Sequence, residues 1–254
     1  MTQYSSSSIG YLLIGQYDLT NISSKLEDNI EAPIEDTTPF GVSTTTYGKP
    51  GFKKYGLSGH EGWYDDATSS INAAMIGMAS TEEVFMMAYQ GNTAGKYAIC
   101  AGGAIRAGYK RGFEVGQYHK ASFDLSISGT RDEGIILGTL VARSGAGNTE
   151  GAYLDLNSYG GSGSPSGTLG CTLYVCVTSY TPDTSSGLII TFEDSTTTGT
   201  FLSQCATASI TAIGGYKVVS ADMTVNRYIA LKWAWGGTVG AAAATFTAAI
   251  AINR

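Results

Sequence analysis

The chain has 254 residues, a net charge of −6 at pH 7 and only 14% charged residues. A typical globular protein has about 25% charged residues, so we expect neighbouring subunits to cover part of this surface. The acidic balance, without a cluster of Lys and Arg, argues against a nucleic-acid-binding surface. The 34 glycines, with abundant Ser, Thr and Tyr and short alternating apolar runs, predict a mainly β protein with many tight turns.

The sequence carries no export or membrane signal that we can identify. Its first residues, MTQYSSSSIGY, lack a cationic region and a long apolar core, so we expect no signal peptide. The nearest candidate for a membrane span, Ala241–Ile252, is shorter than the ~20 residues needed and is interrupted by Thr245 and Thr247. We therefore expect a protein made in the cytoplasm, without a membrane partner.

The chain contains four cysteines, Cys100, Cys171, Cys176 and Cys205. Their spacing matches neither a zinc motif nor a disulfide framework. Cys171 and Cys176 lie five residues apart in one predicted strand, so they point to opposite faces and cannot share a metal. We expect buried free thiols.

The first segments in chain order have the pattern of strands. Ile9–Leu19 is an apolar strand that Gly15 interrupts, which also fits the start of a hairpin. Ile22–Ile34 alternates loosely and is marked at its end by Pro33. After a long loop, Lys53–Tyr64 follows as a third strand.

The loop between the second and third strands, residues 35–52, is a polar stretch with no usable period, EDTTPFGVSTTTYGKPGF. Compact domains rarely contain connections this long unless the loop is functional or disordered. Three aromatic residues and two prolines are atypical of a disordered linker, and ordering its backbone costs roughly 1–2 kcal/mol per residue. We therefore interpret the loop as an arm that docks on another subunit. The residues expected to make this inter-subunit contact are Pro39, Phe40, Tyr47, Pro50 and Phe52.

One helix is predicted, over residues 66–77. Asp66 or Thr68 can cap its start, and Gly77 suits its end. The apolar stripe at helical spacing consists of Ile71, Ala74 and Met75. The strands predicted after the helix are Val84–Tyr89, Tyr97–Ile105 and Tyr109–Ile127.

A composition shift at Ser128–Glu133 predicts a boundary between a first domain at residues 1–130 and a second at residues 131–254. The strands predicted beyond it are Ile135–Val141, Leu169–Val177, Leu188–Phe192, Tyr216–Val219, Arg227–Trp235 and Ala244–Ile252. In the last two strands, one face carries Ile229, Leu231, Trp233 and Trp235, and another carries Phe246, Ala248, Ile250 and Ile252. This alternation predicts that the second domain is a β-sandwich.

No motif assembles a catalytic site. The only histidines, His60 and His119, lack both a zinc motif and a serine placed for a triad, so we interpret them as ordinary polar residues on strands. Gly91–Lys96 lacks the spacing of a phosphate loop and predicts a hairpin turn. The acidic pairs Asp65–Asp66 and Glu82–Glu83 suit helix caps or turns.

Two patterns are compatible with a ligand-binding site. Asp155 with Asn157 is a lone D-x-N, which is a very weak calcium signal. A sugar-binding platform could use Trp63, Trp233 and Trp235, although the alternation around the last two favours core packing. We expect no catalytic residue, no cofactor and no metal, and we do not expect an enzyme.

The first half has a characteristic order of motifs. The segment GQYDLT at Gly15–Thr20 is followed by a strand and the Thr/Pro/Gly loop, and the strand GLSGHEGWYD at Gly56–Asp65 precedes the only helix. In this order the chain resembles the major tail tube protein of long-tailed bacteriophages. The second half, with VNRY at Val225–Tyr228 and the terminal run ATFTAAIAINR, resembles sandwich segments that end many phage tail proteins.

The resemblance implies a first domain that is a tail-tube-like β-sandwich or barrel with one α-helix. It also implies a virion protein, assembled in the host cytoplasm, that forms stacked rings, usually hexameric. The sheets of neighbouring subunits would join edge to edge into a tube, which removes exposed strand edges. The implied partners are other copies of the chain and other tail proteins, with genomic DNA as transient cargo in the lumen. An acidic or neutral lumen would let the DNA slide. The sandwich would lie on the tube exterior or help to stack rings.

Two other functions stay open from the sequence. A capsid decoration or cement protein would share the sandwich and the low charge, but would more often form trimers and would not need the long arm. A glycan-binding or receptor-binding tail module would use the tryptophans of the sandwich.

Overall fold

The computed structural model describes residues 10–31, 35–36, 47–48, 54–65, 67, 70–145, 147–148, 153–159, 170–182, 187–221, 223–236 and 242–252. Within this part of the chain the fold is mainly β with one α-helix, which confirms the predicted fold class. None of the sheets formed by these residues closes into a barrel. The helix in these ranges is not long and apolar enough to cross a membrane.

Eleven strands form the first sheet. They are β1 (Tyr11–Ile14), β2 (Tyr17–Asp18), β3 (Ser23–Glu31), β6 (Lys54–Trp63), β7 (Glu83–Ala88), β8 (Tyr97–Gly112), β9 (Lys120–Ile127), β10 (Arg131–Ser144), β13 (Cys171–Thr181), β16 (Gly214–Ser220) and β18 (Ala243–Ile252). The main path of the sheet is β16-β13-β18-β10-β8-β7-β1-β2, and β9, β6 and β3 branch from β8 in that order. All pairs are antiparallel, and short 3₁₀ turns occupy Thr20–Ile22 and Leu156–Tyr159.

The two parts of the first sheet meet on β8. Its first part pairs with β7 on one side and β10 on the other, and its second part pairs with β9. β9 and β10 lie end to end along β8, because Ile127 pairs with Ala104 and Arg131 pairs with Ala101. Between these pairs the backbone of Ser128 donates a hydrogen bond of 2.7 Å to the carbonyl of Gly103. A Cβ at Gly103 would lie 2.9 Å from the Ser128 carbonyl oxygen, so the approach requires glycine.

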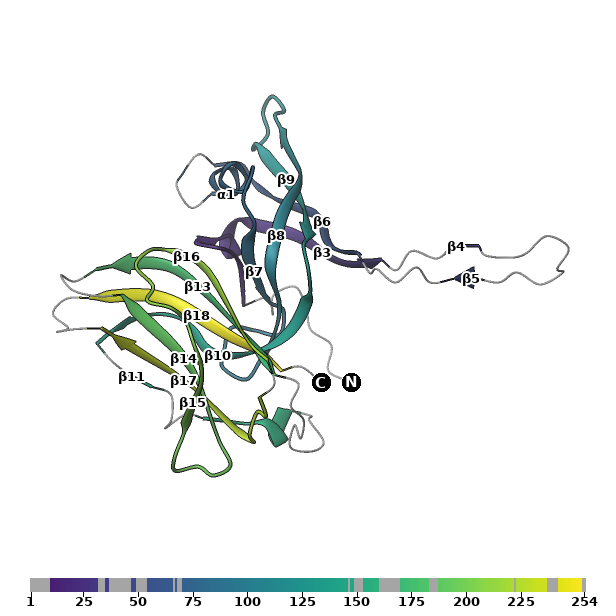
Figure 1. The fold of residues 1–254 in the computed structure, drawn as a ribbon. Coiled ribbons are helices and arrows are strands. Elements are labelled where there is room, and N and C mark those ends of the chain that lie inside the picture. Colours follow the sequence, from purple (N-terminus) through teal and green to yellow (C-terminus); the bar gives the residue numbers. More distant parts are fainter. Residues whose placement is uncertain are drawn as a thin grey trace, which may run out of the picture.

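The second sheet packs on one face of the first sheet as a β-sandwich, as predicted for the C-terminal half (Figure 1). Its five strands are β11 (Gly147–Asn148), β12 (Leu154–Asp155), β14 (Leu188–Ser195), β15 (Leu202–Ala206) and β17 (Tyr228–Trp235). The C-terminal core between the sheets includes Ile190, Phe192, Ile229, Leu231, Leu173, Val175, Phe246 and Ile250. The apolar faces predicted for β17 and β18 therefore belong to the same core.

The N-terminal half packs helix α1 (Ile71–Gly77) with strands of the first sheet around a second core. This N-terminal core includes Leu12, Ile14, Leu57, Phe85, Phe123 and Leu125. The predicted helical stripe of Ile71, Ala74 and Met75 is buried in it.

Helix α1 begins later than predicted. The Ser70 side chain caps it by accepting a hydrogen bond of 3.1 Å from the Ala73 amide. Asp65 instead accepts a bond from the Ala67 amide in the turn before the helix. The predicted helix start at residue 66, with a cap at Asp66 or Thr68, is wrong, because the helix begins at Ile71 and Ser70 is its cap. Asp66 and Thr68 lie outside the described ranges.

A third group of buried residues joins the two halves. This shared core includes Tyr11, Leu13, Val84, Met86, Cys100, Ile136, Tyr174, Cys176 and Ala249. The first sheet and the shared core thus contain residues from both sides of residue 130, and the domain division predicted there stays a prediction.

A buried chain of hydroxyl groups ties β1 to β18 and β10. The Thr247 hydroxyl donates to the Gly138 carbonyl at 2.7 Å, and it lies 2.8 Å from the Tyr11 hydroxyl. A threonine hydroxyl has a single hydrogen, so Tyr11 is the donor in the second bond. β10 changes register on both sides of Gly138, and the chain of hydroxyls satisfies the carbonyl at this bulge.

The two strands predicted over residues 97–127 are wrong in extent, and Tyr97–Ile105 is too short because β8 continues to Gly112. Tyr109–Ile127 is not a single strand, because β8 ends at Gly112 and β9 begins at Lys120, and the two pair as a hairpin. In the turn between them Gly116 adopts a φ of 80°, a left-handed conformation that favours glycine.

Other turns agree with the sequence. Gly15 lies in the turn of a β1–β2 hairpin, and Gly91–Lys96 forms the turn from β7 to β8. The sequence pattern predicts neither β12 nor β15, since the first has only two residues and the second, LSQCA, does not alternate between apolar and polar residues.

Replacing Thr247 by valine should destabilise the fold by about 2 kcal/mol or more, because the Tyr11 hydroxyl and the Gly138 carbonyl would both be buried without a partner. Tyr11→Phe alone should cost only about 1 kcal/mol, since Thr247 keeps its bond to Gly138. Adding Tyr11→Phe to Thr247→Val should recover part of the loss. Denaturant unfolding of the three variants measures this, and strictly additive losses would contradict the hydroxyl chain.

All four cysteines are free and buried, as predicted, and Cys171 and Cys176 lie in different cores. Burial raises the pKa of the Cys100 and Cys176 thiols, which keeps them protonated and unreactive. We expect a chromogenic disulfide reagent at pH 8 to leave the native protein unmodified and to modify all four thiols in guanidinium chloride. Rapid modification of any thiol in the native protein would contradict their burial.

Candidate assembly interface

Strands β3 and β6 continue as a hairpin arm beyond the rest of the first sheet. They pair up to Glu31 opposite Lys54, and further out the short strands β4 (Glu35–Asp36) and β5 (Tyr47–Gly48) pair with each other. Figure 1 shows β4 and β5 well outside the body that the other strands form. The described part of the 35–52 loop is therefore a two-stranded continuation of the β3–β6 hairpin.

Most of the arm residues that we predict to contact another subunit are not among the residues that the structure describes. Pro39, Phe40, Pro50 and Phe52 lie outside the described residues. The backbone of Tyr47 pairs with Asp36 in the arm, and its side chain is not described. Their contact with another subunit stays a prediction.

Four exposed apolar side chains lie in the turn between β8 and β9 and at the adjoining end of β6. We define this tip patch as Trp63, Phe113, Val115 and Tyr118, whose exposed fractions are 47%, 60%, 103% and 83%. In Figure 1 the β8–β9 turn projects past α1 at the top of the molecule. Grouped exposed apolar residues of this kind mark interaction sites on soluble proteins.

Contacts within the chain hold the tip patch in place. The rings of Trp63 and Tyr118 meet edge to face at 5.7 Å between centroids, and those of Tyr64 and Phe113 meet at the same distance. The Phe113 ring also packs on His119 at 4.8 Å. The Tyr64 amide donates a bond of 2.9 Å to the His119 carbonyl, which fixes the end of β6 to the start of β9. Such preorganised aromatic residues lose little entropy on binding.

The tip patch has a mixed border with three cations and two carboxylates. Lys110, Arg111 and Lys120 are exposed beside it, as are Glu114 in the turn and Asp65 after β6. The Arg111 guanidinium lies over the Tyr64 and Tyr109 rings, at 6.0 and 5.7 Å from their centroids. An acidic or polar surface would therefore complement the border.

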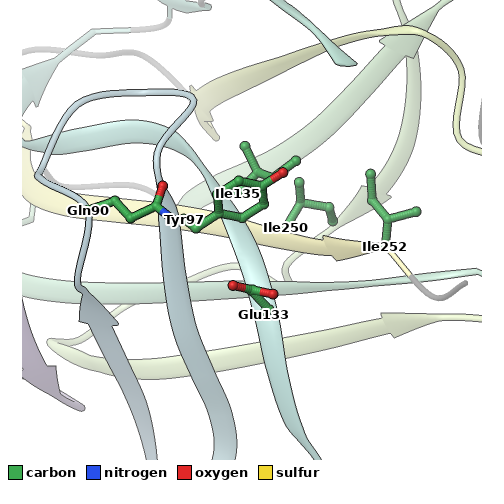
Figure 2. A pocket seen from close by; sticks show the side chains of 6 residues that line it. All are labelled: Gln90, Tyr97, Glu133, Ile135, Ile250 and Ile252. Atoms are coloured by element: carbon green, nitrogen blue, oxygen red, sulfur yellow. The ribbon is translucent and has the colours of Figure 1, made fainter. Parts of the chain in front are cut away.

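A pocket of about 380 Å³ lies where β8, β10 and β18 meet. Figure 2 shows the six side chains that line it, Gln90, Tyr97, Glu133, Ile135, Ile250 and Ile252. Ile135 and Ile250 pair directly across β10 and β18, so the floor is apolar. Glu133 and Gln90 contribute the polar groups, and the Tyr89 hydroxyl donates to Glu133 Oε1. Burial, followed by this bond to the carboxylate, raises the pKa of Tyr89, so its hydroxyl stays a donor at neutral pH.

Asp155, the carboxylate of the D-x-N pattern, forms hydrogen bonds within the chain. Asp155 accepts two bonds from the Arg227 guanidinium, at 2.8 and 2.6 Å, and Arg227 holds the pKa of Asp155 below its usual value. The Asp155 carboxylate also accepts a bond from the Asn157 amide, which explains the D-x-N spacing as a turn. In the described ranges, no group of three or more His, Cys, Asp or Glu side chains could hold a metal ion.

The tryptophans do not form a common platform. Trp235 is buried in the C-terminal core, whereas Trp63 lies in the tip patch. Trp233 packs on that core and stacks with Arg143, whose guanidinium lies 5.1 Å from the Trp233 ring and 4.2 Å from the Phe246 ring. The core packing expected for the two sandwich tryptophans is confirmed.

The sequence patterns predict neither the tip patch nor the pocket. The tip patch is hidden because Tyr109–Ile127 has the alternation of one strand, although Gly112 and Gly116 mark the turn. The pocket is lined from a turn and three strands that are far apart in sequence, so no local motif precedes it. His119 lies beside the tip patch, and the His60 side chain is outside the description.

The sequence matches no protein-family model and no curated protein. Three solved structures are similar in fold to parts or most of the chain. A chain from the tail of an empty gene transfer agent particle with C6 symmetry has 11% identity and a TM-score of 0.39, over 51% of this chain and 97% of its own. A chain from the virion of the native gene transfer agent has 10% identity and a TM-score of 0.41, over 52% of this chain and 98% of its own.

The third structure covers more of the chain with a lower score. It is the Dit protein of phage SPP1, described as a hub of the adsorption apparatus in phages that infect Gram-positive bacteria. It has 10% identity and a TM-score of 0.32, over 95% of this chain and 99% of its own. At TM-scores below 0.5 none of these likenesses assigns a family or a function to the chain.

Replacing Val115 by aspartate should leave the free energy of unfolding within about 0.5 kcal/mol of the unmodified protein, because this side chain is fully exposed. The same change should weaken self-association, because it places a charge in the tip patch. Denaturant unfolding and sedimentation velocity measure the two effects. Leu202→Asp, at an exposed apolar residue of β15, is the matched control. Equal effects of both variants on association would exclude a specific role for the tip patch.

Proposed function

We propose that this chain is a structural protein of a bacteriophage tail, which polymerises into stacked hexameric rings and forms the tail tube. Its partners in this role are other copies of itself and other tail proteins, and DNA passes through the lumen as transient cargo. The observation that carries the proposal is the arm, in which β4 and β5 prolong the β3–β6 hairpin outside the body of the fold (Figure 1).

The arm favours an assembling protein for an energetic reason. A two-stranded hairpin is marginally stable in water unless a third strand or an apolar face covers it. A surface on a neighbouring copy can supply that cover. The sequence of the arm contains the aromatic residues such a contact needs, Phe40, Tyr47 and Phe52.

The order of elements around the arm supports the resemblance to tail tube proteins. The GQYDLT segment begins in the β1–β2 turn and continues past β2, where the Asp18 side chain accepts a bond of 3.0 Å from the Thr20 amide. The GLSGHEGWYD segment lies in β6 and the two residues after it, and α1 follows. The arm lies between these two segments, as the resemblance implies.

An open sheet edge offers a second route to a ring. Of the described strands, β3 pairs only with β6, so its other edge is available to a neighbouring sheet. The exposed Lys25 and Glu27 pair at 2.8 Å on this strand. Charged residues on an edge discourage random pairing, and a ring of identical copies would pair each edge with one defined neighbour.

The two halves of the chain suggest different roles within the tube. We assign residues 1–130, with the arm and the open edge, to ring formation and the lumen. We assign residues 131–254, the sandwich, to the exterior or to contacts between rings. The fully assembled protein would reside in the virion.

Deleting Thr37–Gly51 should abolish polymerisation and leave a folded monomer, because the deletion removes the outer arm and none of the three cores. Negative-stain microscopy of the purified protein at high concentration, with circular dichroism of the deletion variant, measures both effects. Leu202→Ala is the matched control and should still form tubes.

Isolated trimers of the unmodified protein would contradict the tube and favour a capsid decoration protein. Tubes that persist after the deletion would contradict the role of the arm. The glycan-binding alternative loses its proposed platform, because Trp233 and Trp235 pack in the sandwich.

A further inference from the structure

The tip patch and the pocket lie at opposite ends of one strand. Tyr97, the first residue of β8, lines the pocket, and Gly112, the last, leads into the tip patch. β8 has 16 residues, so at about 3.3 Å per residue its ends are up to about 50 Å apart. The tip patch of one copy therefore cannot fill its own pocket.

The two surfaces are complementary in chemistry. Of the three isoleucines that line the pocket, Ile252 is partly exposed, whereas Ile135 and Ile250 are buried; Glu133 and Gln90 lie at its side, and its lining contains no cation. The tip patch presents apolar rings with Lys110, Arg111 and Lys120 on its border. The Glu133 carboxylate of one copy and the cations beside the tip patch of another attract each other, which favours a defined pairing and speeds the encounter.

Tyr118 is the side chain of the tip patch best suited to enter the pocket. It is 83% exposed and makes one ring contact within its own chain, with Trp63, whereas Phe113 is 60% exposed and packs on two rings. A tyrosine has an apolar ring and a hydroxyl at its end, so it fits a pocket with an apolar floor and a carboxylate.

We infer that the tip patch of one copy docks in the β8–β10–β18 pocket of the next copy, with the Tyr118 ring on Ile252 and its hydroxyl bonded to Glu133 or Gln90. This inference rests on the proposed function, because it names a surface through which the copies assemble. The contact joins different surfaces on the two copies, so it is heterologous and produces a closed ring or a filament.

Chemical cross-linking between two populations of the protein tests the contact. One population carries Val115→Cys in the tip patch and the other carries Gln90→Cys at the pocket. The four native cysteines are buried, so a bismaleimide reagent should react at the engineered positions. A mixture of Val115→Cys with Leu202→Cys is the matched control. We expect cross-linked dimers in the first mixture and none in the control.

Substitution of Tyr118 provides a second, independent measurement. Tyr118→Ala should raise the concentration needed for assembly by about tenfold or more, as for a central aromatic residue of an interface. Tyr118→Phe should have a smaller effect, because it keeps the ring, and Glu133→Gln should resemble Tyr118→Phe.

The outcomes separate this contact from the proposed function. Assembly with cross-linking through the pocket, and its weakening by Tyr118→Ala, would support the inference. Assembly without this cross-link, unchanged by Tyr118→Ala, would overturn the inference and leave the proposed function intact. A protein that stays monomeric at all concentrations would overturn both.

Discussion

The fold depends on the antiparallel pairing of β8 with β9 and β10, which holds the two halves of the chain in one sheet. β8 exchanges hydrogen bonds with β10 at Arg131 and with β9 at Ile127, only a few residues apart. A strand that changes partner along its length needs a local break in the ladder, and Gly103 beside Ser128 permits it. The positions of the hairpin tip, the pocket and the sandwich all follow from this one register.

β10 is bulged around Gly138, next to buried apolar groups, and polar side chains donate hydrogen bonds to carbonyls at and near the bulge. Besides the Thr247 bond to Gly138, the Arg143 guanidinium donates to the carbonyls of Thr139 and Phe246, at 2.8 and 2.6 Å. Burial lowers the pKa of Arg143 to about 10, so the side chain remains charged at neutral pH. Arg143 therefore stabilises the bulged strand through its bonds to these carbonyls and its contacts with the Trp233 and Phe246 rings. No carboxylate in the described part of the chain forms an ion pair with it.

The sequence predicts the parts of the fold that depend on local pattern. The alternation in β17 and β18 predicts the two faces of the sandwich core, and the stripe of Ile71, Ala74 and Met75 predicts the buried side of α1. It does not predict the branch of the sheet at β8, because strand pairing depends on contacts far apart in sequence. The helix start is missed because several capping residues precede Ile71 and only packing selects Ser70.

The candidate interface is less predictable for the same reason. The length and composition of the 35–52 loop indicate an arm, and the structure gives its root as the β3–β6 hairpin. The tip patch depends on a turn at Gly116 within a continuous alternating pattern, and exposed aromatic residues in such a pattern look like core residues. Only the three-dimensional arrangement distinguishes the exposed Tyr118 from the buried Phe123 a few residues later.

In the proposed contact one strand carries both surfaces, which would couple assembly to folding. A copy in which β8 is not fully paired would lack the geometry of both the tip patch and the pocket, because the two lie at the ends of that strand. Incompletely folded copies would then neither donate nor accept a neighbour, and they would stay out of the polymer. Polymerisation in turn would stabilise the folded copies, because the assembled contact binds only the native arrangement. A protein with only 14% charged residues has little electrostatic protection against random association, and it would gain specificity from such coupling.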